Sequence, residues 1–325
     1  MATLHVSIVV DWEGEHFRDL GDLRAVRDAI QTSLGRTVPF THFICPTYWL
    51  EPHTPVDPAS AIRTAWSKGD EVALHVHCWE ALVRAAGVPF SSTPDWNQDG
   101  TGHGVPLGTY GRDAKTIVAC ARDLVQRKLG ATVHGFRCGG AMTSDVVYEA
   151  LMALGFRYDC SAFPVEVISR GFGPHSRGNL RDTFGARNVI ANYLVDLWGH
   201  APMHTPECGN SLALAGNGGG ITPTTQPFWV RSGEHRILEM PGNGGISDYA
   251  SASYMRTTFD ALLARARERD VPTFFTIGCH QEGAGRWKRP LIDFCHERRA
   301  ALTSDRVVMT TVAKAAKVAR RIVAE

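Results

Sequence analysis

Two histidines stand one residue apart in the stretch EVALHVHCWE, residues 71–80. The apolar run that contains them predicts a strand, and alternate residues of a strand point to the same face. His75 and His77 would then project together, with Val76 on the opposite face. Imidazole nitrogens are common ligands of zinc and similar ions, so the pair could bind a metal. The alternative is one histidine in the core and one at a solvated edge.

Apolar runs alternate with helical patterns along the whole chain of 325 residues, as is typical of parallel strands joined by helices. Two long irregular segments, residues 85–113 and 164–235, interrupt this alternation. We interpret them as insertions in a single domain that covers residues 1–325. The alternation alone fits a barrel and an open sheet equally well. The expected strands are residues 4–11, 38–46, 71–77, 132–138, 156–162, 236–241, 272–280 and 306–312.

Reactive side chains gather at the ends of these expected strands. The carboxyl ends of parallel strands meet at one edge of a sheet, and catalytic groups of α/β proteins lie at that edge. The sequence therefore predicts one rim that carries carboxylates, imidazoles and a guanidinium. Its members are Asp11, Glu13, His75, His77, Arg137, Cys138, Glu239, His280, Gln281 and Glu282.

This set of groups could perform metal-assisted hydrolysis. Either Asp11 or Glu13, with the two histidines of residues 71–80, would supply about three protein ligands and leave a position open for water. The metal would activate that water, and the carboxylate that is not a ligand could take its proton. His280 could protonate a leaving amine, and Arg137 could orient the carboxylate base. The predicted reaction is hydrolysis of an amide or an ester.

Five segments resemble, in the same order, the motifs of a known family: the metal-dependent polysaccharide deacetylases with the NodB homology domain, also called carbohydrate esterase family 4. The first resembles the acidic motif, the second the histidine motif, and the third the arginine motif with its helix and the aspartate-serine motif. The fourth resembles the late histidine motif, and the fifth the closing strand and helix. The segments are SIVVDWEGE, DEVALHVHCWE, GFRCGGAMTSDVVYEALMALGFRYDCSA, TIGCHQE and RVVMTTVAKAA.

The resemblance implies an α/β fold, a distorted (β/α)7 barrel of the NodB type. It also implies a divalent metal, usually zinc, held by one acid and two histidines, of which His75 is the first. In this family an aspartate acts as base and the late histidine acts as acid, which points to Asp11 and His280, and Arg137 lies in the segment that resembles the arginine motif. The first acid of the motif is usually the base and the second the ligand. A glutamate ligand, here Glu13, is unusual, so Asp11 could bind the metal instead.

The histidine motif departs from the family pattern. Its second ligand normally follows the first by four residues, where this chain has Trp79. Either His77 or Glu80 must replace it, or the metal site is altered or lost. Trp79 itself could offer an aromatic face to a sugar ring.

Composition excludes several other classes of function. The formal net charge is +1, with 34 Lys and Arg against 33 Asp and Glu, which offers no electrostatic case for binding nucleic acid. No apolar run is long enough to span a bilayer, and the amino terminus has no basic leader. The eight cysteines form no C-x-x-C pair and fit reduced thiols. We therefore expect a cytoplasmic protein with no nucleic-acid or membrane partner.

The sequence thus predicts a metal-dependent hydrolase, with zinc as the favoured divalent metal, that removes an N-acyl group, acetyl by the resemblance, from an acetamido sugar in a cytosolic glycan or secondary-metabolite intermediate. The substrate would be a small molecule or an oligosaccharide. One alternative is a hydrolase of a non-sugar amide, and another is a sugar-binding module that has lost the metal. The residues expected to contact the substrate are Trp79, Cys138, Gly139 and Glu239.

Overall fold

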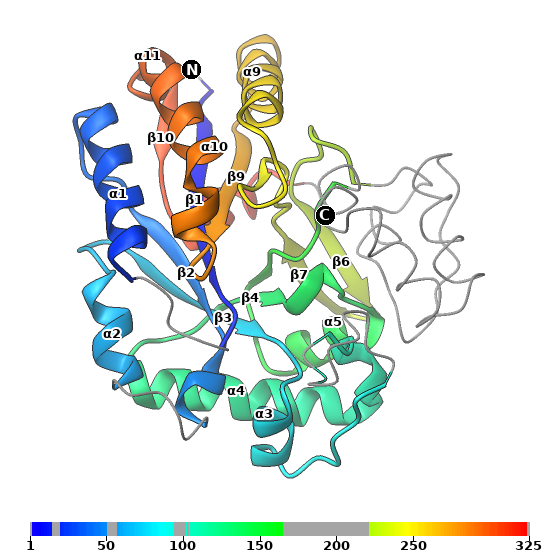
Figure 1. Ribbon diagram of the computed structural model, residues 1–325. Helices are drawn as coiled ribbons and strands as arrows, with labels where there is room; N and C mark the ends of the chain where they lie inside the picture. Colours follow the sequence, from blue (N-terminus) through cyan, green and yellow to red (C-terminus); the bar gives the residue numbers. More distant parts are fainter. Residues whose placement is uncertain are drawn as a thin grey trace.

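A single curled sheet forms the centre of the molecule (Figure 1). The computed structural model describes residues 2–14, 20–50, 57–93, 102, 104–164 and 221–323. Within these ranges ten strands pair in the order β6-β7-β5-β4-β3-β2-β1-β9-β8, and β10 also pairs with β1. The strands are β1 (Leu4–Trp12), β2 (Phe40–Ile44), β3 (Glu71–Val76), β4 (Gly135–Cys138), β5 (Tyr158–Asp159), β6 (Phe228–Ser232), β7 (His235–Glu239), β8 (Gly245–Ile246), β9 (Thr273–His280) and β10 (Val307–Met309).

Every described pairing in the sheet is parallel except that of β6 with β7. Strand β1 runs between β2 and β9, and all nine of its residues are buried, as expected for a parallel strand covered on both faces. Helices pack around the outside of the curl (Figure 1). They are α1 (Leu20–Leu34), α2 (Pro58–Thr64), α3 (Glu80–Ala85), α4 (Ala114–Leu129), α5 (Asp145–Ala153), α9 (Ala252–Arg269), α10 (Ala284–Glu297) and α11 (Arg299–Leu302). The last helix, α12 (Val312–Ala319), lies elsewhere, and 3-10 turns form at Pro46–Trp49, Leu107–Asp113 and Gly139–Ala141.

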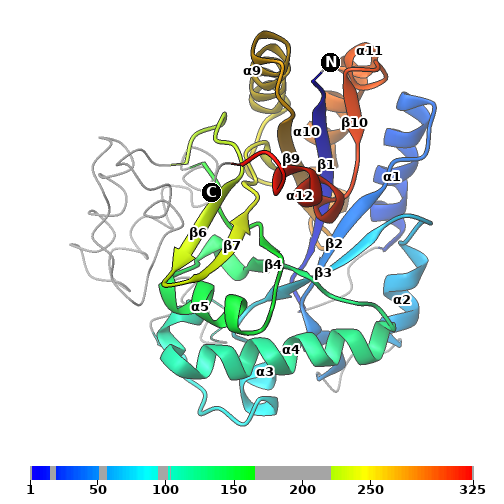
Figure 2. The same ribbon diagram turned by 180° about the vertical axis from the view of Figure 1, so that it is seen from behind.

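Helix α12 crosses the amino-terminal edge of the sheet (Figure 2). The hydroxyl of Thr41 accepts a hydrogen bond from the backbone N–H of Val312 at 2.9 Å, and the carboxylate of Glu71 accepts one from Ala313 at 2.8 Å. These two acceptors satisfy donors that the first turn of a helix leaves unpaired. The apolar side of α12 joins the inner core formed by Val9, Phe43, Ala73, Tyr158, Leu238 and Phe274.

Two side-chain amides bridge β9 to the segments beside β6 and β7. Gln226 donates to the carbonyl of Phe274 at 3.3 Å and accepts from its N–H at 2.9 Å. Asn243 donates to the same carbonyl at 3.0 Å and accepts from the N–H of Thr276 at 3.0 Å. Each amide carries one donor and one acceptor side, so it pairs with a strand as another backbone would. The sheet therefore curls toward a barrel.

The structure confirms the α/β alternation and all eight expected strands, with corrections to their lengths. The strand expected at 156–162 covers only Tyr158–Asp159. The strand expected at 306–312 ends at Met309, because Thr311 caps α12 by accepting a hydrogen bond from Lys314. Strands β6 and β8 were not predicted.

The two expected insertions are only partly described. Residues 94–101 and 103 of the first, and 165–220 of the second, lie outside the described residues. Strand β6 forms near the end of the second segment. No helix within the described ranges is both long and apolar enough to cross a membrane.

Candidate metal centre and active site

The carboxyl end of β1 brings two acids to the same rim. Asp11 lies within the strand, opposite His280 of β9, and Glu13 follows one residue after the strand ends. Strand alternation points Asp11 and Glu13 to one face and Trp12 to the other. On that other face the indole N–H of Trp12 donates to Nδ1 of His42 at 3.2 Å. The D-x-E spacing therefore delivers two carboxylates to one side of the sheet.

Glu13, His75 and His77 form a cluster of possible metal ligands. One ligand atom from each lies within 4.8 Å of the others. Nε2 of His75 is 3.4 Å from Oε1 of Glu13, and Nε2 of His77 contacts Oε2. The two imidazoles pack edge to face with their centroids 4.8 Å apart. The expected pair of histidines and one of the two expected acids thus meet at the rim.

The protonation of this cluster fits a divalent metal. Nδ1 of His75 lies 3.0 Å from the backbone carbonyl of Arg137, which can only accept, so Nδ1 carries the proton. In the neutral imidazole that binds a metal, Nε2 of His75 would present its lone pair; this atom is buried and makes no hydrogen bond among the described residues. Burial alone would raise the pKa of Glu13, but the imidazoles of His77, His75 and His280 lower it well below its usual range. One carboxylate with two imidazoles is a common ligand set of catalytic zinc.

Asp11 is not part of this cluster. Its two carboxylate oxygens accept hydrogen bonds from NH1 of Arg137 at 2.8 and 2.9 Å. The guanidinium is itself fixed, because Nε donates to the carbonyl of Cys160 at 2.9 Å and NH2 to its sulfur at 3.0 Å. Both members of the pair are nearly inaccessible, at 2% exposure for Asp11 and 1% for Arg137. The structure therefore brings Arg137 and Asp11 together, next to Glu13.

His280 lies between Glu13 and an acid that the sequence analysis did not identify. Nε2 of His280 is 3.3 Å from Oε1 of Glu13, and Nδ1 is 3.3 Å from Oδ1 of Asp248. The backbone N–H of His280 also donates to Asp248, at 3.3 Å. Burial alone would lower the pKa of this imidazole, but Asp248, Tyr249 and Glu13 raise it well above its usual range. Asp248 therefore orients the ring of His280 and favours its protonated form.

Asp248 follows the short strand β8, which pairs with β9. The local sequence signal is only an acid two residues after Ile246 and three residues before Ser251, the cap of α9. The ring of Tyr249, 39% exposed, packs edge to face on His280 with centroids 5.6 Å apart. Asp248 and Tyr249 directly follow the glycine-rich stretch PGNGGIS, residues 241–247.

Of the two candidates to replace the second histidine, only His77 lies in the cluster. Glu80 begins α3, is exposed, and pairs with Arg84 at 2.7 Å. Trp79 is 8% exposed, and its indole N–H donates to the backbone carbonyl of Glu13 at 2.9 Å. The indole therefore packs behind the rim and does not present an open face to a substrate.

The other residues expected to contact a substrate are also buried beneath the rim. Cys138 donates through its N–H to the hydroxyl of Ser161 at 2.8 Å. A Cβ at Gly139 would lie 2.6 Å from Nδ1 of His77, so the absence of a side chain lets the imidazole pack there. Glu239 is fully buried, and burial together with the neighbouring Asp159 raises its pKa well above its usual range. These three positions support the rim from below.

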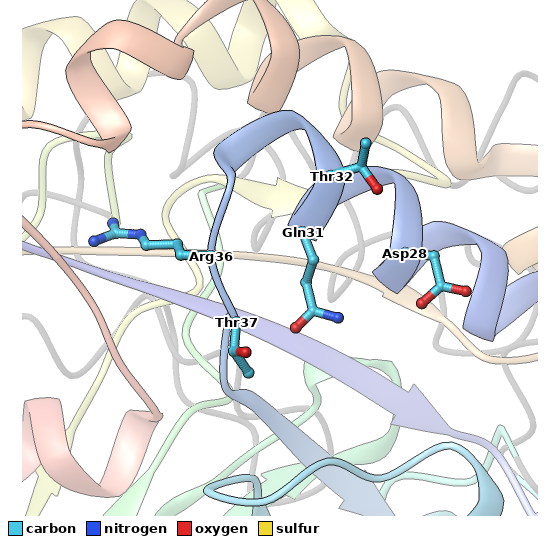
Figure 3. A pocket seen from close by; sticks show the side chains of 5 residues that line it. All are labelled: Asp28, Gln31, Thr32, Arg36 and Thr37. Atoms are coloured by element: carbon cyan, nitrogen blue, oxygen red, sulfur yellow. The ribbon is translucent and has the colours of Figure 1, made fainter.

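A surface depression lies where α1 ends and the chain turns toward β2 (Figure 3). This is the amino-terminal edge of the sheet, opposite the rim. Gln31 accepts a hydrogen bond from the N–H of Val38 at 3.2 Å, and Arg36 donates to the carbonyl of Leu302 at 2.6 Å. These contacts join neighbouring segments of the fold, and the depression takes no part in the candidate site. Its lining residues are Asp28, Gln31, Thr32, Arg36 and Thr37.

Comparison with known proteins rests on structure. The sequence matches no protein-family model and no curated protein. It is similar to a structure from Mycobacterium smegmatis assigned as a polysaccharide deacetylase, with a TM-score of 0.51, 14% identity, and coverage of 99% of this chain and 92% of that one. A structure from Pseudomonas aeruginosa PAO1 with the same assignment gives a TM-score of 0.51, 12% identity, and coverage of 99% and 92%. The chain has the polysaccharide deacetylase fold.

A third similar structure is the Puue allantoinase, with a TM-score of 0.52, 12% identity, and coverage of 99% of this chain and 91% of that one. These similarities confirm the predicted fold class, a NodB-type barrel. At 12–14% identity they show the fold alone. The roles of individual residues therefore rest on the geometry of the rim.

Proposed function

We propose that this protein is a metal-dependent amide hydrolase that removes an N-acyl group, most simply acetyl, from an acetamido sugar. One observation carries the proposal: Glu13, His75 and His77 lie within 4.8 Å of one another, on a rim that also holds a buried carboxylate and a histidine bound to a carboxylate. These are the groups that hydrolysis of an amide requires.

Glu13, His75 and His77 would hold the metal, for which their oxygen and nitrogen donors favour zinc. A bound divalent ion would polarise the acyl oxygen and lower the pKa of a bound water. Asp11, oriented by Arg137, would accept the proton of the attacking water.

His280 would donate a proton to the departing amine nitrogen. Asp248 holds the other nitrogen of its ring and favours the protonated state before the reaction. Asp11 and His280 lie opposite each other on the neighbouring strands β1 and β9, so the proposed base and acid are adjacent in the sheet. The proton taken from water and the proton given to the amine therefore pass through two different side chains.

The proposed substrate is a small molecule or an oligosaccharide that carries an acetamido sugar, within a cytosolic glycan or secondary-metabolite intermediate. Similarity to structures assigned as polysaccharide deacetylases supports the sugar. The cytosolic part rests on the sequence expectations alone. Hydrolysis of a non-sugar amide is the second candidate, because the similarity to an allantoinase is equally strong.

Metal analysis combined with an assay of acetate release tests the proposal. The protein is purified, stripped with a chelator, reloaded with zinc, and supplied with N-acetylglucosamine oligosaccharides or with non-sugar amides. We expect about one ion per chain and hydrolysis that depends on it, and we expect His75→Ala to lose both. Full metal occupancy in His75→Ala, or equal turnover by the stripped protein, would contradict the proposal. A non-catalytic binding module would show no turnover with either substrate class.

A further inference from the structure

The backbone of Glu13 is held by side chains from two other strand ends. Glu13 lies just beyond β1, and the next residue, Gly14, has a positive φ of 90°. The N–H of Glu13 donates to Oε1 of Glu282 at 3.2 Å, and its carbonyl accepts from the indole N–H of Trp79 at 2.9 Å. Both polar groups of this one peptide position are thus bound by side chains that are distant in sequence.

The two partners are themselves fixed. Oε1 of Glu282 also accepts a hydrogen bond from the hydroxyl of Tyr48, which is 1% exposed. The chain before Glu282 stays beside β1, because the N–H of Gln281 donates to the carbonyl of Asp11 at 2.8 Å. Trp79 is 8% exposed and stands at the cap of α3. Neither contact is therefore made by a freely moving surface side chain.

We propose that Trp79 and Glu282 are positioning residues that clamp the backbone of Glu13 so that its carboxylate meets His75 and His77. The inference rests on the proposed function, in which Glu13 is a metal ligand. Glutamate has one more rotatable bond than aspartate, and Glu13 lies outside the strand ladder that fixes Asp11. An unclamped Glu13 would have to be ordered when the metal binds, and that ordering would weaken affinity.

The clamp also accounts for the departure in the histidine motif. Trp79 occupies the position where the resemblance expects the second histidine ligand. Here that position orients the acidic ligand through an N–H group, and His77 supplies the imidazole to the cluster. The two departures from the family pattern, a glutamate as the acidic ligand and Trp79 at the position of the second histidine, are therefore structurally linked.

Zinc competition titration of the metal-stripped protein tests the clamp. Trp79→Phe keeps a ring in place and removes the N–H donor, and Glu282→Ala removes the acceptor. Each should weaken zinc affinity by about 10-fold, the lower end of the effect of residues that orient a ligand. Glu282→Gln keeps an acceptor oxygen and should restore affinity to within about threefold. The matched control is Trp66→Phe, because the buried indole nitrogen of Trp66 has no hydrogen-bond partner among the described residues.

The thermal midpoint of each stripped variant separates clamping from a general loss of packing. Loss of zinc affinity at an unchanged midpoint, with rescue by Glu282→Gln, supports the clamp. If Glu282→Ala does not fold, the zinc affinity of Trp79→Phe compared with that of Trp66→Phe tests the clamp. Zinc affinity within about twofold of wild type in Trp79→Phe would overturn the clamp while leaving the metal site intact, provided that His75→Ala abolishes binding. Retained binding in His75→Ala would instead refute the proposed function.

Discussion

Replacing Asp11 by Asn, with Glu13→Gln for comparison, separates the base from the ligand. Asp11→Asn keeps the shape of the side chain and removes its ability to take a proton. We expect turnover to fall by about 10²- to 10⁴-fold, the usual effect of losing a positioned base. Zinc affinity should stay within about threefold, because Asp11 lies outside the ligand cluster.

Asp11→Asn should also cost stability. It leaves the Arg137 guanidinium, 1% exposed, without its counter-charge. Removing one partner of a buried ion pair costs about 3–5 kcal/mol, and the lower end applies here because the Asn oxygen can still accept one hydrogen bond. That is a large share of the roughly 5–15 kcal/mol that stabilises a typical domain. The exposed Asp123 serves as the control, since Asp123→Asn should change the unfolding free energy by less than about 0.5 kcal/mol.

Urea unfolding of the stripped protein, zinc titration, and turnover measured well below the unfolding temperature together check these values. Glu13→Gln should weaken zinc binding by more than about 100-fold, because it removes one of about three protein ligands. Parallel loss of zinc and turnover in Asp11→Asn would refute this division of roles and make Asp11 a ligand. Unchanged turnover in Asp11→Asn would remove it from the mechanism.

Three further outcomes follow from the same contacts. Asp248→Asn should lower the pKa of His280. Activity falls at alkaline pH where His280 loses its proton, so this alkaline limb of the pH–activity profile should move to lower pH. An unmoved limb would contradict the role of Asp248. Gly139→Ala places a Cβ 2.6 Å from Nδ1 of His77. It should weaken zinc affinity by about 10-fold or more, with the number of zinc ions per chain unchanged. Wild-type affinity would contradict this expectation and show that the imidazole can shift freely. Burial alone would raise the pKa of Asp70, but the neighbouring His42 and Arg27 lower it to about 2. The charged carboxylate therefore stabilises the fold at pH values above the pKa of Asp70 in the unfolded chain, and this stabilisation is lost as the pH falls through about 2. Asp70→Asn should therefore cost roughly 1–2 kcal/mol near pH 6, allowing for solvent screening, and much less near pH 2; an equal cost at both pH values in urea unfolding would contradict it.

The alternation of strands and helices, and the reactive residues near the strand ends, were predictable from local pattern, although β5 and β10 ended earlier than predicted. Alternation that continues one residue beyond the end of β3 places His75 and His77 on one face, and one residue beyond β1 it does the same for Asp11 and Glu13. Parallel strands then carry these groups to one rim, which is why residues distant in sequence could be grouped before any contact was known.

Contacts that depend on tertiary packing were not predictable. Asp248 follows a strand of only two residues, too short to show a period. A tryptophan or a glutamate at a strand end can face either a ligand or the core, and only packing decides. The indole N–H of Trp79 donates to a backbone carbonyl, and the carboxylate of Glu239 accepts hydrogen bonds from the hydroxyl of Tyr148 and the N–H of Ala162.

The central claim is that Glu13, His75 and His77 together hold a divalent metal, and zinc titration of His77→Ala beside Glu80→Ala tests it most directly. His77→Ala should weaken zinc binding by more than about 100-fold, nearly as much as His75→Ala, because it removes a ligand rather than a supporting contact. Glu80→Ala should bind zinc as wild type does, since Glu80 is exposed and paired with Arg84. Tight binding retained in His77→Ala and lost in Glu80→Ala would contradict the claim and assign the third ligand to Glu80.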